Sequence, residues 1–118
     1  MPEGLSALLL GWGLDWAWFK DALERALGVS SDALHVIVGV TLQLALVALL
    51  RTTLARIAPW ALVLALTLLN EWNDFRVERW GDTALQWGEA AKDVGLTMLL
   101  PTVLLLLARW RPGLFGLR

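Results

Sequence analysis

The residues that could do chemistry are one histidine and several carboxylates that recur at helical spacing. His35 is the only histidine, and Gly39 and Gln43 follow it at intervals of four residues, so that all three share one face of a helix. Two more polar stripes at helical spacing follow along the chain: Thr67, Asn70, Glu71, Asp74 and Glu78, each of which lies three or four residues from another, and then Glu89, Asp93 and Thr97 at intervals of four. Imidazole and carboxylate groups exchange protons and bind cations, which predicts carboxylate, proton or cation chemistry.

These stripes lie within an unusually apolar chain. Of its 118 residues, 58% are hydrophobic, with eight Trp and no Cys or Tyr, and the mean hydropathy is +0.61. Soluble proteins contain about 45–50% apolar residues even when Gly is counted, so we expect a lipid bilayer as the solvent. The composition argues against a disulfide framework, a Cys-bound metal and a thiol nucleophile. The absence of a basic run or patch argues against a nucleic-acid partner.

Stretches without charge predict three transmembrane helices, because a helix needs about 20 residues to cross the hydrocarbon core. The first stretch is the longest, and the other two need their flanking charges at the membrane margin. The predicted helices are 33–50, 57–74 and 92–110. Residues 75–91 are expected to form a polar loop or an interfacial helix.

Local signals define the ends and shape of these helices. Ser30 or Ser31 is suitably placed to cap the first of them. Pro59 suits a first helical turn. Pro101 lies in the middle of the third helix, where it lacks an N–H and should free the carbonyl of Thr97.

The N-terminal segment 4–28 is expected to be a half-length or interfacial helix that ends at Gly28. Its apolar positions, among them Trp16 and Phe19, lie opposite a charged face, as in a helix that lies on a membrane. A tilted fourth span is the alternative, and a cleavable signal peptide is not expected because a basic n-region is missing. We therefore predict one all-α membrane domain over residues 1–118.

The charges are distributed unevenly between the two sides of the predicted topology. All eleven acidic residues fall on the side of the N-terminal segment and the loop 75–91, whereas the other side carries five Arg and no acid. The net charge of −1 is therefore a sum of −6 and +5. Arg next to the span ends favours the cytoplasm, so the Arg-rich loop and C-terminus are placed there and the acidic face outside.

Tryptophan shows the same asymmetry. Trp60 and Trp110 belong to the Arg-rich side. The acidic side has six: Trp12, Trp16, Trp18, Trp72, Trp80 and Trp87. Because Trp favours the headgroup level, an anchoring belt explains part of this set. The surplus predicts a surface that contacts lipid or a partner helix.

The polar stripes should face one another at the acidic membrane face, because polar groups aimed at lipid cost several kcal/mol, in order of magnitude. The resulting candidate cluster consists of His35, Asn70, Glu71, Asp74 and Asp93. These residues could instead have purely structural roles. His35 would then be a packing residue at a helix start, and the acids would form an ion-pair network with Arg76, Arg79 and Lys92. A divalent cation at the carboxylates is a third hypothesis, and the sequence leaves the metal undefined.

The order of these residues resembles the VanZ-like family of small polytopic bacterial membrane proteins. The resemblance covers residues 32–108 and rests on three short segments: Leu34-His35, Leu69-Asn70-Glu71-Trp72 and Lys92-Asp93-Val94-Gly95. It implies that His35, Glu71 and Asp93 are the characteristic positions, and it implies a bacterial cytoplasmic (inner) membrane. Some family members are linked to glycopeptide resistance, whereas their biochemical activity is not well defined.

The sequence favours a non-enzymatic role, because it has no nucleophile elbow, no Cys and no phosphate-binding loop. No cofactor is predicted, and haem or pigment ligation is not expected because His35 has no second histidine or Cys beside it. Small size and the Trp surplus predict a membrane subunit that packs against and stabilises a larger complex. A VanZ-like protein with a functional site for a cation, a proton or a lipid-linked ligand is the alternative.

Overall fold

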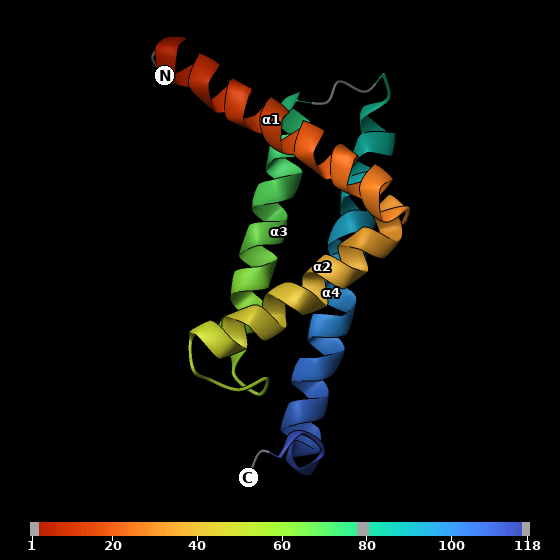
Figure 1. Ribbon diagram of the computed structural model, residues 1–118. Coiled ribbons are helices and arrows are strands. Elements are labelled where there is room, and N and C mark those ends of the chain that lie inside the picture. The colour runs from red at the N-terminus through yellow and green to blue at the C-terminus, as the bar shows by residue number, and fades with distance from the viewer. Residues whose placement is uncertain (1–2, 78–80, 117–118) are drawn as a thin grey trace.

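The computed structural model describes residues 3–77 and 81–116, which form helices and connecting turns and include no strand (Figure 1). The elements are α1 (Glu3–Leu27), α2 (Ser31–Leu49), α3 (Ile57–Val77), α4 (Thr83–Trp110) and the 3-10 helix η1 (Pro112–Phe115). The predicted all-α class is confirmed. Residues 83–91, expected as a loop or an interfacial helix, are instead the first turns of α4.

Two of the described helices, α2 and α4, are long and apolar enough to cross a membrane. Three such helices were expected. Helix α3 is not one of the two, and its last turns carry the polar residues Asn70, Glu71 and Asp74. The segment predicted as interfacial or as a fourth span is one continuous helix of 25 residues, α1. Because α1 mixes Leu and Trp with charged residues, it is not among the helices that are apolar enough to cross a membrane.

The helix ends follow the local signals in the sequence. The Ser30 side chain accepts a hydrogen bond from the Ala33 N–H at 3.1 Å and caps α2, which confirms the predicted cap. Asp82 caps α4 in the same way, through the N–H groups of its first turn. Gly28 has a φ of +67° directly after α1, so a residue that tolerates the left-handed region ends that helix, as predicted.

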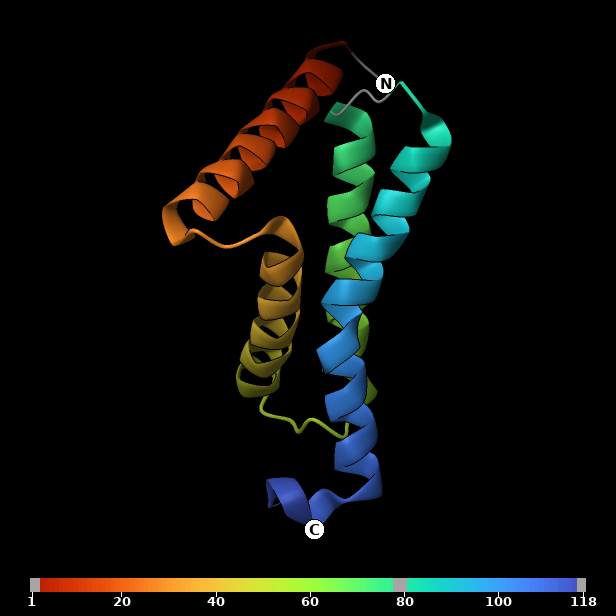
Figure 2. The same ribbon diagram turned by 90° about the vertical axis from the view of Figure 1, so that its right-hand side faces the viewer.

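Helices α2, α3 and α4 pack against one another, and α1 lies obliquely across the end of this bundle where α3 ends and α4 begins (Figures 1 and 2). Helix α1 packs against α3. The molecule measures 52 × 30 × 29 Å. Its long axis therefore exceeds the roughly 40–45 Å thickness of a bilayer with its headgroups.

The core is small and follows α4. Its buried apolar residues are Val63, Ala90, Met98, Leu105 and Ala108. Large apolar side chains are instead exposed on all four long helices, for example Leu8, Leu44, Leu69 and Leu106. Such a surface is unusual for a protein in water, and it suits contact with lipid or with another apolar protein.

Helices α2 and α4 approach each other so closely that their backbones are in contact at Gly39. A Cβ added to Gly39 would overlap the carbonyl oxygen of Thr97, which lies four residues before Pro101 and has no proline N–H to accept from. One turn further along α2, the Gln43 Nε2 donates to the carbonyl oxygen of Pro101 at 2.9 Å. Gln43 is 1% exposed, so this polar contact fixes the register of two apolar helices.

Candidate functional site

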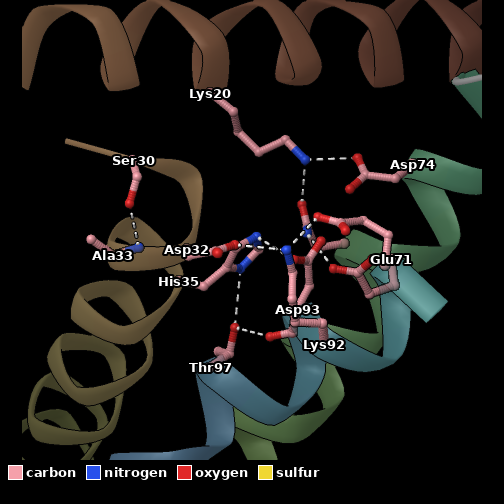
Figure 3. Close-up of polar contacts among 12 residues, drawn as sticks. Lys20, Ser30, Asp32, Ala33, His35, Glu71, Asp74, Lys92, Asp93 and Thr97 are labelled. Carbon is pink, nitrogen blue, oxygen red and sulfur yellow. Dashed lines mark hydrogen bonds and ion pairs between the residues drawn. The ribbon is translucent and has the colours of Figure 1, made fainter. Parts of the chain in front are cut away.

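Three helices bring the predicted cluster together near the end of the bundle that α1 crosses (Figure 3). Helix α2 contributes His35, α3 contributes Asn70, Glu71 and Asp74, and α4 contributes Asp93. Glu71 and Asp93 are each 7% exposed, which is rare for carboxylates. The spacing of four residues explains the convergence, because each helix presents its polar positions on one face.

Asp93 and Thr97 of α4 surround the imidazole of His35. The Nε2 atom lies 3.5 Å from Asp93 Oδ1, and Nδ1 lies 3.1 Å from Thr97 Oγ1. The Thr97 hydroxyl donates to the carbonyl oxygen of Asp93 at 2.8 Å. Because a hydroxyl has one hydrogen, Thr97 must accept from His35, and the Nδ1 atom therefore carries the proton.

This arrangement directs the second nitrogen of His35 at a carboxylate. With Nδ1 protonated, a neutral imidazole presents the lone pair of Nε2. Asp93 Oδ1 is buried and has no hydrogen-bond partner. Two electron-rich atoms that face each other repel unless a positive charge lies between them, so this pair needs a shared proton or a metal ion.

Glu71 completes the arrangement from α3. Its Oε1 atom accepts a hydrogen bond from Asn70 Nδ2 at 3.3 Å. One ligand atom each from His35, Glu71 and Asp93 lies within 4.8 Å of the other two. These side chains are therefore close enough to bind one small cation together.

The ion pairs differ from the predicted network. Lys92 pairs with Asp32 and Glu89 at 3.1 Å each, and the Arg76 guanidinium lies over the Trp72 ring at 4.6 Å. Among the described residues, no Lys or Arg forms an ion pair with Glu71 or Asp93. The third member of the expected network, Arg79, lies outside the described residues, as does Glu78.

The partner that the sequence did not reveal is Lys20 of α1. Its Nζ atom pairs with Asp74 Oδ1 at 2.7 Å and donates to Asn70 Oδ1 at 2.9 Å. Trp16 Nε1, one turn earlier, donates to the same amide oxygen at 2.8 Å. This corrects the expected arrangement of the segment, in which Trp16 lay opposite the charged face. Trp16 and Lys20 are four residues apart and share one face of α1, and both contact Asn70 of α3.

A groove of about 780 Å³ opens beside the cluster. Trp12, Trp16 and Lys20 line it from α1, and His35, Asn70 and Asp93 line it from the other three helices. Its walls continue along α2 and α3 as apolar side chains, including Val38, Leu42 and Leu66. The groove is thus apolar along most of its length and polar at the cluster, a combination that suits an amphipathic molecule.

The Trp residues predicted to contact lipid or a partner lie on several surfaces. Trp12 and Trp16 line the groove, and Trp18 is 72% exposed. Trp72 and Trp87 border a second, apolar hollow between α3 and α4, where Trp87 packs on Phe75 with ring centres 4.7 Å apart. Trp80 lies outside the described residues.

Comparison of the chain with protein-family models, curated proteins and solved structures finds no match. The resemblance to the VanZ-like family therefore stays a prediction from the residues alone.

Proposed function

We propose that this chain is an integral membrane protein that binds an amphipathic ligand in the groove that α1, α2, α3 and α4 line. The groove itself is the observation that carries this proposal, because apolar walls lead to a polar end with His35, Asn70 and Asp93. The ligand's apolar part would lie along Val38 and Leu42, and its polar part at the cluster. This is the site-bearing alternative that the VanZ-like residue pattern suggests.

Tryptophan substitutions at two positions of α2 test this proposal. Leu42 lines the groove, whereas Leu44 is 48% exposed and is not part of the lining. Leu42→Trp should fill the groove, and Leu44→Trp adds the same bulk elsewhere on the helix. The protein is extracted with its surrounding lipid in polymer discs, and bound amphiphiles are measured by mass spectrometry.

We expect one class of amphiphile to be enriched over the bulk membrane in the wild type and in Leu44→Trp, and to be depleted in Leu42→Trp. Equal profiles in all three proteins, with unchanged thermal unfolding, would contradict a ligand in the groove.

A second candidate function is that of a small subunit that stabilises a larger membrane complex. The observation that favours it is the hollow between α3 and α4, where Trp72, Phe75 and Trp87 form an apolar surface. Such a surface fits the aliphatic side chains of a partner helix. Extraction from native membranes in mild detergent, followed by size-exclusion chromatography and mass spectrometry, tests it. Migration as a monomer without a co-purifying protein would contradict it.

The proposed orientation places the Arg-rich end in the cytoplasm of a bacterial inner membrane and the cluster at the outer face. Arg109 supports it, because its Nε donates to the carbonyl oxygen of Ala55 at 2.8 Å and so keeps a positive charge at the loop between α2 and α3. A Cys introduced at Gly81, which is exposed at the opposite end, should react with an impermeant maleimide in intact cells. Protection of that Cys would reverse the topology.

A further inference from the structure

We infer that His35, Glu71 and Asp93 bind one divalent transition-metal ion. The three donors come from three helices that are separate in sequence, and their ligand atoms lie within 4.8 Å of one another. Metal–nitrogen and metal–oxygen bonds of about 2.0–2.2 Å in a tetrahedral site place neighbouring ligand atoms about 3.4 Å apart. A movement of each ligand atom by less than about 1 Å, within the range of side-chain rotation, would therefore bring all three into contact with one ion.

The surroundings of His35 are those of a metal ligand. The Thr97 hydroxyl donates to the carbonyl oxygen of Asp93, so its Oγ1 accepts from Nδ1 of His35. The tautomer with a proton on Nδ1 leaves Nε2 free to bind a metal. Asn70 holds Glu71 in a similar way, through its Nδ2 at 3.3 Å. Hydrogen bonds from neighbouring residues to the ligands are the usual means by which a protein orients a metal site.

The local charges also favour a cation. Asp93 Oδ1 is buried without a hydrogen-bond partner and faces Nε2 at 3.5 Å. The lysines near the cluster pair elsewhere, Lys20 with Asp74 and Lys92 with Asp32 and Glu89. Two buried carboxylates without a Lys or Arg partner among the described residues are strongly stabilised by a dication.

The donor set defines the class of ion. Calcium and magnesium prefer oxygen ligands alone, whereas a nitrogen ligand beside two carboxylates suits Zn²⁺, Mn²⁺ or Fe²⁺. Three protein ligands leave at least one coordination position open, and His35 and Asp93 line the groove. An oxygen atom of a molecule in the groove could therefore complete the coordination.

A second group of acids near the cluster is less suited to bind a metal ion. One ligand atom each of Asp32, Glu89 and Asp93 also lies within 4.8 Å of the other two. Lys92 already bridges Asp32 and Glu89, and its ammonium occupies the position of a cation. Glu89, which belongs to this second group alone, therefore provides a control for the site at His35.

Metal uptake by the full-length protein tests the inference. The protein is purified in detergent, stripped with a chelator and titrated with Zn²⁺, and the bound metal is measured by mass spectrometry. Co²⁺ is used in parallel, because its absorption spectrum reports nitrogen and carboxylate ligation. We expect one ion per chain.

The variants separate the site from its surroundings. His35→Ala, Glu71→Gln and Asp93→Asn should each weaken the affinity at least about tenfold, while Glu89→Gln and the exposed Asp21→Asn retain it. Thr97→Val should weaken it by roughly 10–100-fold and change the Co²⁺ spectrum, because Thr97 orients His35 without touching the metal. Circular dichroism and thermal unfolding confirm that each variant is folded.

Failure to bind Zn²⁺ or Co²⁺ by folded wild-type protein would overturn the inference and would indicate that His35 and Asp93 share a proton. Retained binding in Asp93→Asn and Glu71→Gln would overturn it as well. The lipid profile of Leu42→Trp is measured without added metal, so the metal site and the ligand groove can fail separately.

Discussion

Helices α2 and α4 meet in a different way from helices α1 and α3, although both pairs have a glycine at the point of contact. A Cβ at Gly39 of α2 would overlap the backbone carbonyl oxygen of Thr97. A Cβ at Gly13 of α1 would instead overlap the Asn73 side chain, whose Nδ2 donates to the carbonyl oxygen of Gly13 at 3.2 Å. The first pair is in contact through its backbone and the second through side chains that can move.

The polar contacts of the two pairs also differ. Between α2 and α4, the hydrogen bond of Gln43 is fully buried, although the side chains of the ion pair of Lys92 with Asp32, where α2 begins, are 46% and 53% exposed. Between α1 and α3, the side chains of Lys20 and Asp74 are 24% and 15% exposed, and Trp16 is 46% exposed. Helices α2 and α4 therefore form the scaffold that holds His35 against Asp93, whereas α1 lines the groove and is held to α3 by partly exposed side chains. We therefore expect α1 to open more easily than the bundle.

Alanine substitutions at the two glycines should give the largest difference between the pairs. We expect Gly39→Ala to lower the free energy of unfolding by about 3 kcal/mol, because the backbones of α2 and α4 must separate. Gly13→Ala should lower it by only about 1 kcal/mol, because the Asn73 amide can rotate away. Thermal unfolding in detergent, followed by circular dichroism, measures both.

The matched control is Gly95→Ala in α4, where an added Cβ meets nothing within 4 Å. It should raise stability by roughly 0.5–1 kcal/mol, since alanine favours a helix more than glycine does. Equal losses from Gly39→Ala and Gly13→Ala would mean that the two helix pairs do not differ in rigidity.

Removal of the contacts of Asn70 should produce a smaller and local effect. Asn70→Ala deletes the oxygen that accepts from both Trp16 and Lys20, and we expect a loss of about 1–2 kcal/mol. Hydrogen exchange should become faster in α1 and stay unchanged in the middle of α2 and α4. Equally faster exchange in all helices would show that α1 is an integral part of the scaffold.

The residues that the sequence alone placed correctly are those with local signals. Ser30 and Gly28 mark helix ends by their own chemistry, and the spacing of four residues placed Gly39 and Gln43 on the face of α2 that meets α4. The same periodicity gathered His35, Glu71 and Asp93 into one hypothesis. These signals act within one helix, so they do not depend on how the helices pack.

The ion-pair partners of the charged side chains depend on how the helices pack, and the sequence alone did not predict them. Lys20 reaches Asp74 because α1 crosses α3, and no spacing within either helix encodes that crossing. Lys92 contacts Asp32 and Glu89 because α2 begins beside α4, which leaves Asp93 to His35. A long, flexible side chain can reach one partner or another when the distance between two helices changes by a few ångströms. The periodicity of a sequence does not define that distance.

The smallest effect is expected for the ion pair between Arg25 and Asp21, two exposed side chains of α1. Their side chains are 78% and 51% exposed, so water screens the attraction. We expect a coupling energy of about 0.3–0.5 kcal/mol from a double-mutant cycle with Arg25→Gln and Asp21→Asn.

The equivalent cycle with Lys20→Met and Asp74→Asn should give about 1 kcal/mol or more, because that pair is more buried and joins two helices. The Arg25 coupling should also vanish in high salt, whereas the Lys20 coupling should decrease less because its two side chains are less exposed to the ions of the solvent. If both couplings had the same size and salt dependence, Lys20 would be a surface lysine and would not hold α1 to α3.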